Sequence, residues 1–248
     1  MQGRRRLIDA VHVNAPWRFA ATPASARNGG AATLACRVSA VPHALVPAIE
    51  DDGLRAASAD GLRRLLVPAQ GWLGAVPELE RLVLHLVRDI HSLAAEPGYD
   101  VSHSQPRWRE RIFVSCPERG DDVGALRLIE SVIHEAMHLH LTSEEEHASL
   151  IAVPSGVAHS PWREADRPVQ GVMHGLYVFT CIHSFLRALT ITPLLADEPR
   201  RYVARRLGTI DEEIGQVDLE GLSRHLTPRG RASVVSWVEE YRPADTKA

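Results

Sequence analysis

The chain has 248 residues, of which 45% are hydrophobic and 24% are charged, as is ordinary for a folded globular protein. Its formal net charge is −3 and its three cysteines are widely spaced, so its composition argues against a nucleic-acid binder and a disulfide framework. Because no uninterrupted apolar run has the length of a membrane span and no signal-peptide core follows Arg4–Arg6, we expect a cytoplasmic protein without a membrane partner.

Up to residue 98 the chain is expected to be mostly helical. The pattern predicts a short helix over residues 6–13, interrupted helical pieces over 44–66 and a turn-rich connector from Val67 to Pro77. A longer helix is predicted from Pro77 until Pro97-Gly98 ends it. Its apolar positions recur at three- and four-residue steps: Leu79, Leu82, Val83, Leu86, Ile90 and Leu93.

The segment Arg111–Cys116 is the best strand candidate, because it is rich in β-branched and aromatic residues. In metallopeptidases of the zincin type, a strand beside the metal helix pairs with the extended substrate peptide. A strand immediately before a metal helix is compatible with this kind of pairing. A turn over residues 117–124 then leads into such a helix.

The stretch Arg127–Leu141 contains the motif H-E-x-x-H at residues 134–138. His134 and His138 lie one turn apart on the same face of a helix, so both imidazoles can bind one metal ion. Glu135 lies about 100° round the helix, where it can serve as a general base beside the ion or can orient its ligands. The other face of the helix is apolar: Leu126, Ile129, Val132, Ile133, Ala136 and Leu139.

A metal ion held by two histidines needs a third protein ligand, with open positions for water or substrate. The acidic residues 144–146 are not expected to share the metal face and are interpreted as a solvated run. Among the downstream histidines we choose His174, at the start of a buried helix over residues 171–190, where Gly171 and Gly175 would allow close approach. Spacing alone favours equally a core histidine that hydrogen-bonds to the backbone.

Two arginines precede this buried helix. Arg163 and Arg167 are candidates for binding an anionic co-substrate, because a guanidinium holds a carboxylate through two hydrogen bonds. On the sequence alone, ordinary surface arginines are the commoner explanation. The tail from Asp197 is again helical, and Thr227-Pro228 is expected to cap a last helix that reaches Tyr241.

Five blocks of the sequence together resemble the HExxH-motif peptide-modification proteins. These proteins occur in bacterial gene clusters for ribosomally made, post-translationally modified peptides (RiPPs). The resemblance covers the chain from about Tyr99 to Leu189. Its blocks are residues 99–104, 111–116, 130–139, 160–163 followed by 167–168, and 174–177.

The resemblance implies a 2-oxoglutarate-dependent dioxygenase that uses Fe(II) to hydroxylate peptides. It implies that His134, His138 and His174 hold the iron. It further implies that Arg163 or Arg167 binds the distal carboxylate of 2-oxoglutarate. Glu130 and Glu135 would then orient or tune the metal ligands.

We therefore expect a predominantly helical α+β fold in which a zincin-like HExxH helix lies beside a small β-sheet. The expected single domain, 1–248, has an N-terminal helical part (1–98), a metal and co-substrate core (99–190) and a C-terminal helical tail (191–248). The expected reaction hydroxylates a side-chain Cβ of a precursor peptide with Fe(II), 2-oxoglutarate and O2.

Two alternatives stay open. The first is a zinc metallopeptidase with Glu135 as the general base. The second is a non-enzymatic peptide-binding module with a structural metal. Because a structural zinc ion has four protein ligands and the sequence offers three plausible ones, the second alternative is the weaker.

Overall fold

The computed structural model describes residues 36–193 and 195–241, which form two compact units that alternate along the chain. The sheet unit comprises the described residues of 36–140 and 185–209, and the hairpin unit comprises 141–184 and 210–241. The helix predicted over residues 6–13 lies outside the described residues. Helices α5 (Asp122–His147), α6 (Val169–Thr190) and α7 (Asp197–Gly215) each begin in one unit and end in the other.

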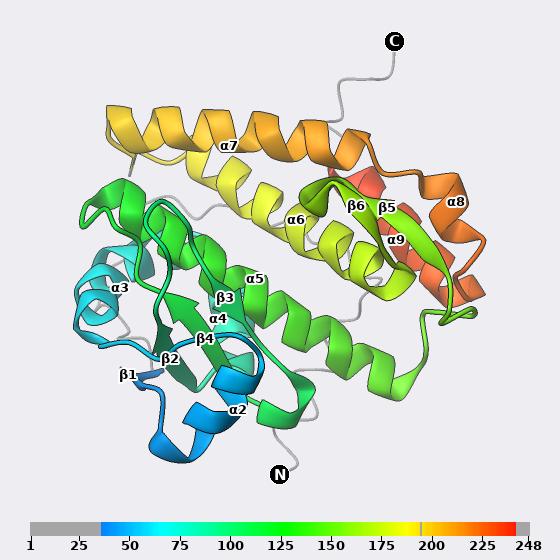
Figure 1. The fold of residues 1–248 in the computed structure, drawn as a ribbon. Helices are drawn as coiled ribbons and strands as arrows, with labels where there is room; N and C mark the ends of the chain where they lie inside the picture. Colours follow the sequence, from blue (N-terminus) through cyan, green and yellow to red (C-terminus); the bar gives the residue numbers. More distant parts are fainter. Residues whose placement is uncertain (1–35, 194, 242–248) are drawn as a thin grey trace. The chain divides into compact units, whose positions relative to one another are not determined.

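The fold is α+β and predominantly helical, as predicted, with 61% of the described residues in helices. A four-stranded mixed sheet with the order β1-β2-β4-β3 organises the sheet unit (Figure 1). β1 (Arg37–Ala40), β2 (Asp89–Leu93) and β4 (Arg111–Ser115) run parallel, whereas β3 (Ser102–His103) pairs antiparallel with β4. The predicted strand at Arg111–Cys116 is therefore confirmed as β4.

The segment around Ile90 is a strand and not the end of a helix. Helix α4 (Pro77–Leu86) begins at the predicted proline, but it ends at Leu86 and all five residues of β2 are buried after it. A short, fully buried strand carries apolar residues that periodicity alone cannot distinguish from a buried helix. The predicted helix is consequently wrong beyond Leu86.

Helix α3 (Asp60–Leu73) continues through Pro68, so the predicted connector from Val67 is wrong as far as Leu73. A proline inside a helix removes one backbone hydrogen bond, and burial of an apolar face offsets that loss. The buried face of α3 consists of Leu62, Leu65, Leu66, Ala69, Trp72 and Leu73. Before it, η2 (His43–Leu45) and α2 (Val46–Asp51) are the short helical pieces that the sequence predicted.

Phe113 lies at the centre of a small core on one face of the sheet. Its ring centroid is 5.2 Å from that of His91 on β2 and 5.1 Å from that of Trp108, which ends η3 (Pro106–Trp108). Val41, Ile49 and Leu93 complete this cluster. Burial lowers the pKa of His91, whose Nδ1 lies 3.1 Å from the Ser39 hydroxyl, so this side chain has a packing function.

The hairpin unit takes its name from β5 (Val157–Ser160) and β6 (Ala165–Pro168), which pair antiparallel across η4 (Pro161–Arg163). The Trp162 indole stacks on Phe179 of α6, with centroids 5.1 Å apart and planes 13° apart. Two short helices, α8 (Leu219–Ser223) and α9 (Pro228–Tyr241), follow α7. The hydroxyl of Thr227 accepts a 3.0 Å hydrogen bond from the amide of Gly230, which confirms the predicted cap of the last helix.

Helix α6 is the one described helix whose length and composition would suit a membrane span. Its most apolar window nevertheless has 83% of its residues buried inside the protein. A core helix that is apolar on every side has this property. The expectation of a buried helix after Gly171 is thus confirmed, and the helix begins at Val169.

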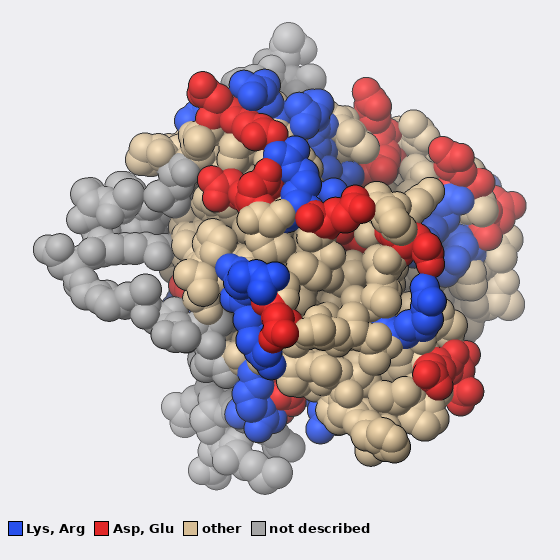
Figure 2. All heavy atoms as spheres, turned by 60° about the vertical axis from the view of Figure 1, so that its left-hand side comes forward, with Lys and Arg blue, Asp and Glu red and all other residues tan. Residues whose placement is uncertain are grey.

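Charged side chains of both signs are mixed on the face drawn in Figure 2, where basic and acidic groups often lie side by side. Among the described residues, exposed ion pairs include Arg63 with Asp60 at 2.8 Å and Arg55 with Glu96 at 2.8 Å. Pairs of this kind contribute little to stability, because solvent screens both charges.

Candidate metal centre

His134 and His138 face each other from successive turns of α5. Their Nε2 atoms are 3.1 Å apart, and their ring centroids are 4.8 Å apart. Two nitrogens bound to one ion at about 2.1 Å would be roughly 3.0 Å apart at a right angle between the bonds and roughly 3.4 Å apart at a tetrahedral angle. The pair therefore has the spacing of two adjacent ligands, although the same distance suits a hydrogen bond between neutral rings.

Glu135 is buried beside this pair and is held by a residue from the sheet. One carboxylate oxygen accepts a 2.6 Å hydrogen bond from the hydroxyl of Ser104, the residue that directly follows β3. The other oxygen lies 4.0 Å from Nε2 of His134. This bond joins α5 to the edge of the sheet, so the HExxH helix lies beside a small sheet as predicted (Figure 1).

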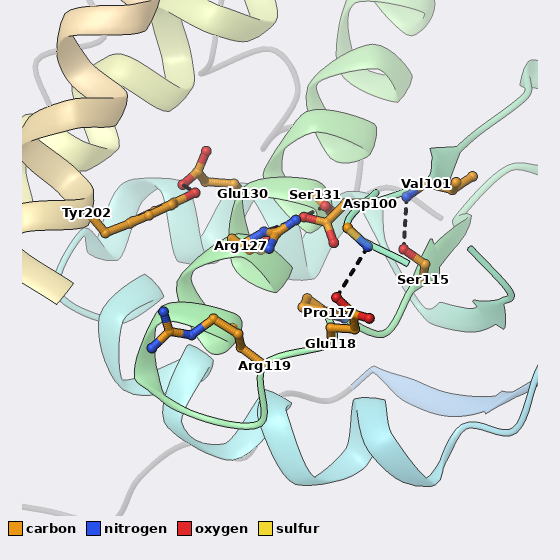
Figure 3. A network of polar contacts seen from close by, with 12 residues as sticks. Asp100, Val101, Ser115, Pro117, Glu118, Arg119, Arg127, Glu130, Ser131 and Tyr202 are labelled. Atoms are coloured by element: carbon orange, nitrogen blue, oxygen red, sulfur yellow. Dashed lines mark hydrogen bonds and ion pairs between the residues drawn. The ribbon is translucent and has the colours of Figure 1, made fainter. Parts of the chain in front are cut away.

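Glu130, one turn before His134, bonds to two residues of α7. Tyr202 donates a 2.7 Å hydrogen bond to one carboxylate oxygen, as Figure 3 shows, and Arg206 donates a 3.1 Å bond to the other. Burial raises the pKa of Glu130, while the charge of Arg206 and the bond from Tyr202 act in the opposite direction. These contacts tie α5 to α7, and the predicted influence of Glu130 on the metal ligands stays a prediction.

His174 belongs to the hairpin unit, where it contacts an acidic residue near the end of α5. Its Nε2 lies 2.8 Å from Oε2 of Glu145, and the Gln170 amide donates a 3.0 Å bond to the same oxygen. Burial alone would raise the pKa of Glu145, but the bonds from His174 and Gln170 hold it below the ordinary value. A carboxylate thus already contacts one of the two ring nitrogens of His174.

The acidic run after the motif is not solvated, so that prediction is wrong for two of its three residues. Glu144 is buried and pairs with Arg229 at 2.9 Å, while Glu145 contacts His174.

The two glycines that flank His174 differ in what lies next to them. A Cβ atom at Gly175 would lie 2.8 Å from the Trp162 ring, so the lack of a side chain at Gly175 allows the indole to pack against the backbone of α6. A Cβ atom at Gly171 would meet no heavy atom within 4 Å.

The two candidate co-substrate residues, Arg163 in η4 and Arg167 in β6, have exposed side chains in the same unit.

The strand that was expected to pair with an extended substrate has no free edge. β4 lies between β2 and β3, and both neighbours pair with its backbone. Within the described residues, the outer strand on the side of Ser104 and Glu135 is β3. Any peptide that extends the sheet beside the HExxH helix would therefore have to pair with β3.

No group of three or more His, Cys, Asp or Glu side chains in residues 36–193 and 195–241 is arranged to hold a metal ion. His134 and His138 are in the sheet unit and His174 is in the hairpin unit, so the prediction that all three bind one metal ion stays a prediction.

All three cysteines are free thiols. Burial raises the pKa of each thiol, that of Cys36 to about 11, so none is an activated nucleophile.

The sequence interpretation missed the partners of the acidic residues. Ser104 was noticed only as part of a matching block, whereas Tyr202 and Arg206 were assigned to a helical tail without a site function. These partners lie 31 to 76 residues from the acids that they contact. No local pattern in the sequence predicts contacts between residues so far apart along the chain.

The described fold and site define a class of protein: an α+β protein whose HExxH helix presents two closely spaced histidines and a buried glutamate. A comparison with models of known protein families finds no match, and a comparison with curated proteins finds no significant one.

Proposed function

We propose that this protein is a non-haem iron, 2-oxoglutarate-dependent dioxygenase that hydroxylates a side-chain Cβ of a ribosomally made peptide. The observation that carries the proposal is the 3.1 Å spacing of the His134 and His138 Nε2 atoms, which suits adjacent ligands of one ion. The sequence resemblance over Tyr99–Leu189 supplies the choice of iron and 2-oxoglutarate. Imidazole itself suits both iron and zinc.

When bound, Fe(II) would couple oxidation of 2-oxoglutarate by O2 to hydroxylation of the peptide. One oxygen atom of O2 enters succinate, which forms with release of CO2, and the other is inserted into a C–H bond. The residues of the chain have simpler tasks. His134, His138 and His174 would donate neutral nitrogens to the ion. Arg163 or Arg167 would bind the distal carboxylate of the co-substrate, since both guanidinium groups are exposed in the unit that also contains His174.

The substrate peptide would lie along β3. A backbone in extended conformation can hydrogen-bond to the outer edge of this strand, and β3 is followed immediately by the residue that holds Glu135. Main-chain pairing of this kind orients the peptide without reading its side chains. Selection of the reacting residue would then depend on the side chains around the histidine pair.

The first experiment needs no knowledge of the peptide. Fe(II) is added anaerobically to the full chain, and 2-oxoglutarate is then titrated while the visible charge-transfer absorption of an iron–keto acid complex is recorded. The proposal expects the band in the wild type, and its loss in His134→Ala and His138→Ala. His174→Ala should also abolish it, and an unchanged band in that variant would remove His174 from the ligand set.

The second experiment tests the reaction. The protein is incubated in air with Fe(II), 2-oxoglutarate and a library of synthetic peptides, after which succinate and peptide masses are measured. We expect succinate release that increases with peptide and a gain of one oxygen atom in the modified peptide. Binding of 2-oxoglutarate without either product would refute the hydroxylase assignment.

A zinc metallopeptidase is the second candidate, and the position of Glu135 favours it. A carboxylate 4.0 Å from a ligand nitrogen is close enough to accept a proton from a water molecule on the metal. For a peptidase, Glu135→Gln should abolish peptide cleavage that requires Zn(II) but neither O2 nor 2-oxoglutarate. For the hydroxylase, the same variant should retain part of its succinate release, because no water has to be deprotonated.

A further inference from the structure

We propose that Ser104 holds the Glu135 carboxylate away from the metal ion bound by His134 and His138, and thereby keeps a coordination position open. The proposal rests on the metal binding proposed above. The residues that it concerns, Ser104, His134, Glu135 and His138, all belong to the sheet unit.

Glu135 does not have the spacing of a ligand in the position next to His134. Two atoms that occupy adjacent positions on one ion, each at about 2.1 Å, are separated by about 3.0 Å. Oε1 of Glu135 lies 4.0 Å from Nε2 of His134, roughly 1 Å beyond that separation. Because two ligands of one ion are no more than about 4.2 Å apart, a carboxylate at this distance is near enough to become a ligand if its side chain rotates.

The hydrogen bond from Ser104 opposes that rotation. Its length of 2.6 Å is short for a hydrogen bond between a hydroxyl and a carboxyl oxygen, and short bonds of this kind are among the stronger hydrogen bonds in proteins. The hydroxyl is well anchored, because the two preceding residues pair with Val114 and Phe113 of β4. Ser104 is consequently a positioning residue for Glu135 and does not itself reach the metal.

An open position matters for either proposed reaction. A keto acid that binds through two oxygens, or a water molecule that attacks a peptide, needs a site that protein ligands have not filled. Glu135 is adjacent to His134 in sequence and is an effective metal ligand by chemistry. A fixed hydrogen bond is the simplest means of keeping such a residue close to the ion without letting it coordinate.

The test uses Co(II) alone as the probe and the full chain as the protein. The visible absorption of bound Co(II) reports its coordination number, and competition with a chelator gives its dissociation constant. We expect Ser104→Ala to free Glu135, to weaken the visible band and to tighten Co(II) binding by about tenfold or more, because the carboxylate becomes an additional ligand. Ser104→Thr keeps the hydroxyl and should behave as the wild type.

A double variant assigns the change to Glu135. In Ser104→Ala with Glu135→Gln, the spectrum and affinity should return toward those of the wild type, because an amide is a poor ligand. Ser102→Ala removes a hydroxyl from the same strand and serves as the control. A purely structural Ser104 predicts the opposite sign: Ser104→Ala would weaken Co(II) binding and leave the band unchanged, and this result would overturn the proposal.

Glu135→Gln alone provides a measurement if Ser104→Ala does not fold. Because the proposal keeps Glu135 off the ion in the wild type, the Co(II) spectrum of this variant should match that of the wild type. A changed spectrum would mean that Glu135 is already a ligand, which contradicts the proposal. Absence of Co(II) binding by the wild type would instead refute the metal site, and so the proposed function.

Discussion

Tyr202 donates a 2.7 Å hydrogen bond to the buried carboxylate of Glu130, and this bond joins α7 to α5 within the sheet unit (Figure 3). Tyr202→Phe removes only the hydroxyl and leaves the buried carboxyl group of Glu130 with one partner fewer. We expect the free energy of unfolding to fall by about 1–3 kcal/mol, the range for a buried acceptor that loses its hydrogen bond. Urea denaturation measures the change.

The matched control is Tyr99→Phe, because the side chain of Tyr99 is 73% exposed. Its hydroxyl is in contact with water in both the folded and the unfolded chain, so removing it should change the free energy of unfolding by less than about 0.5 kcal/mol. Equal effects of the two substitutions would show that the bond between Tyr202 and Glu130 does not stabilise the sheet unit.

His140 should make the protein sensitive to acid. Burial lowers its pKa from 6.5 to about 4 in the folded chain, so between these values the unfolded chain binds a proton that the folded chain does not. The free energy of unfolding should therefore fall by up to about 3 kcal/mol as the pH falls from 6.5 to 4. His140→Leu removes this contribution and should flatten the decline.

The comparison requires urea titrations of the wild type and His140→Leu at several pH values between 7 and 4. His43→Leu is the control, because His43 is exposed. Its pH profile should be parallel to that of the wild type. If His140→Leu also follows the wild-type profile, protonation of His140 is not linked to unfolding.

Gly124 and Gly208 are both helical glycines, yet alanine should have opposite effects at the two positions. A Cβ atom at Gly124 would lie 1.8 Å from the carbonyl oxygen of Arg119, so Gly124→Ala forces the start of α5 to move. We expect a loss of about 1–3 kcal/mol. A Cβ atom added at Gly208 in α7 would meet no heavy atom within 4 Å. Gly208→Ala should therefore stabilise the protein by about 0.5–1 kcal/mol. Thermal unfolding gives both signs, and a shared sign would contradict this account.

The ion pair between Glu144 and Arg229 should be essential to the hairpin unit. Arg229→Met leaves the carboxylate of Glu144 buried without its cation, which should destabilise by about 3 kcal/mol. Adding Glu144→Gln should recover part of this loss, because an amide is easier to bury than a charge. Denaturant midpoints of the single and double variants measure the recovery.

An exposed pair in the same unit is the reference. Arg224 and Glu220 lie 2.5 Å apart at the surface, with both side chains largely in solvent. Arg224→Met should alter the free energy of unfolding by less than about 1 kcal/mol. A loss as large as that of Arg229→Met would argue that burial is not the cause of either effect.

Much of the fold is readable from local patterns. The HExxH helix, β4, the start of α4, the buried helix α6 and the cap at Thr227 all follow from periodicity or capping chemistry. The errors occur where local signals are ambiguous. Pro68 stays inside a helix because its apolar face is buried, and Asp89–Leu93 forms an inner strand with the apolar content of a helix.

The sequence by itself determined that His134 and His138 meet, because helix geometry places residues four apart on one face. Only the tertiary structure decided which groups hold the neighbouring acids: Ser104 for Glu135, Tyr202 for Glu130 and His174 for Glu145. The physical reason is range. Helical spacing is imposed by backbone hydrogen bonds between near neighbours, whereas these side-chain bonds depend on how strands and helices distant along the chain pack together.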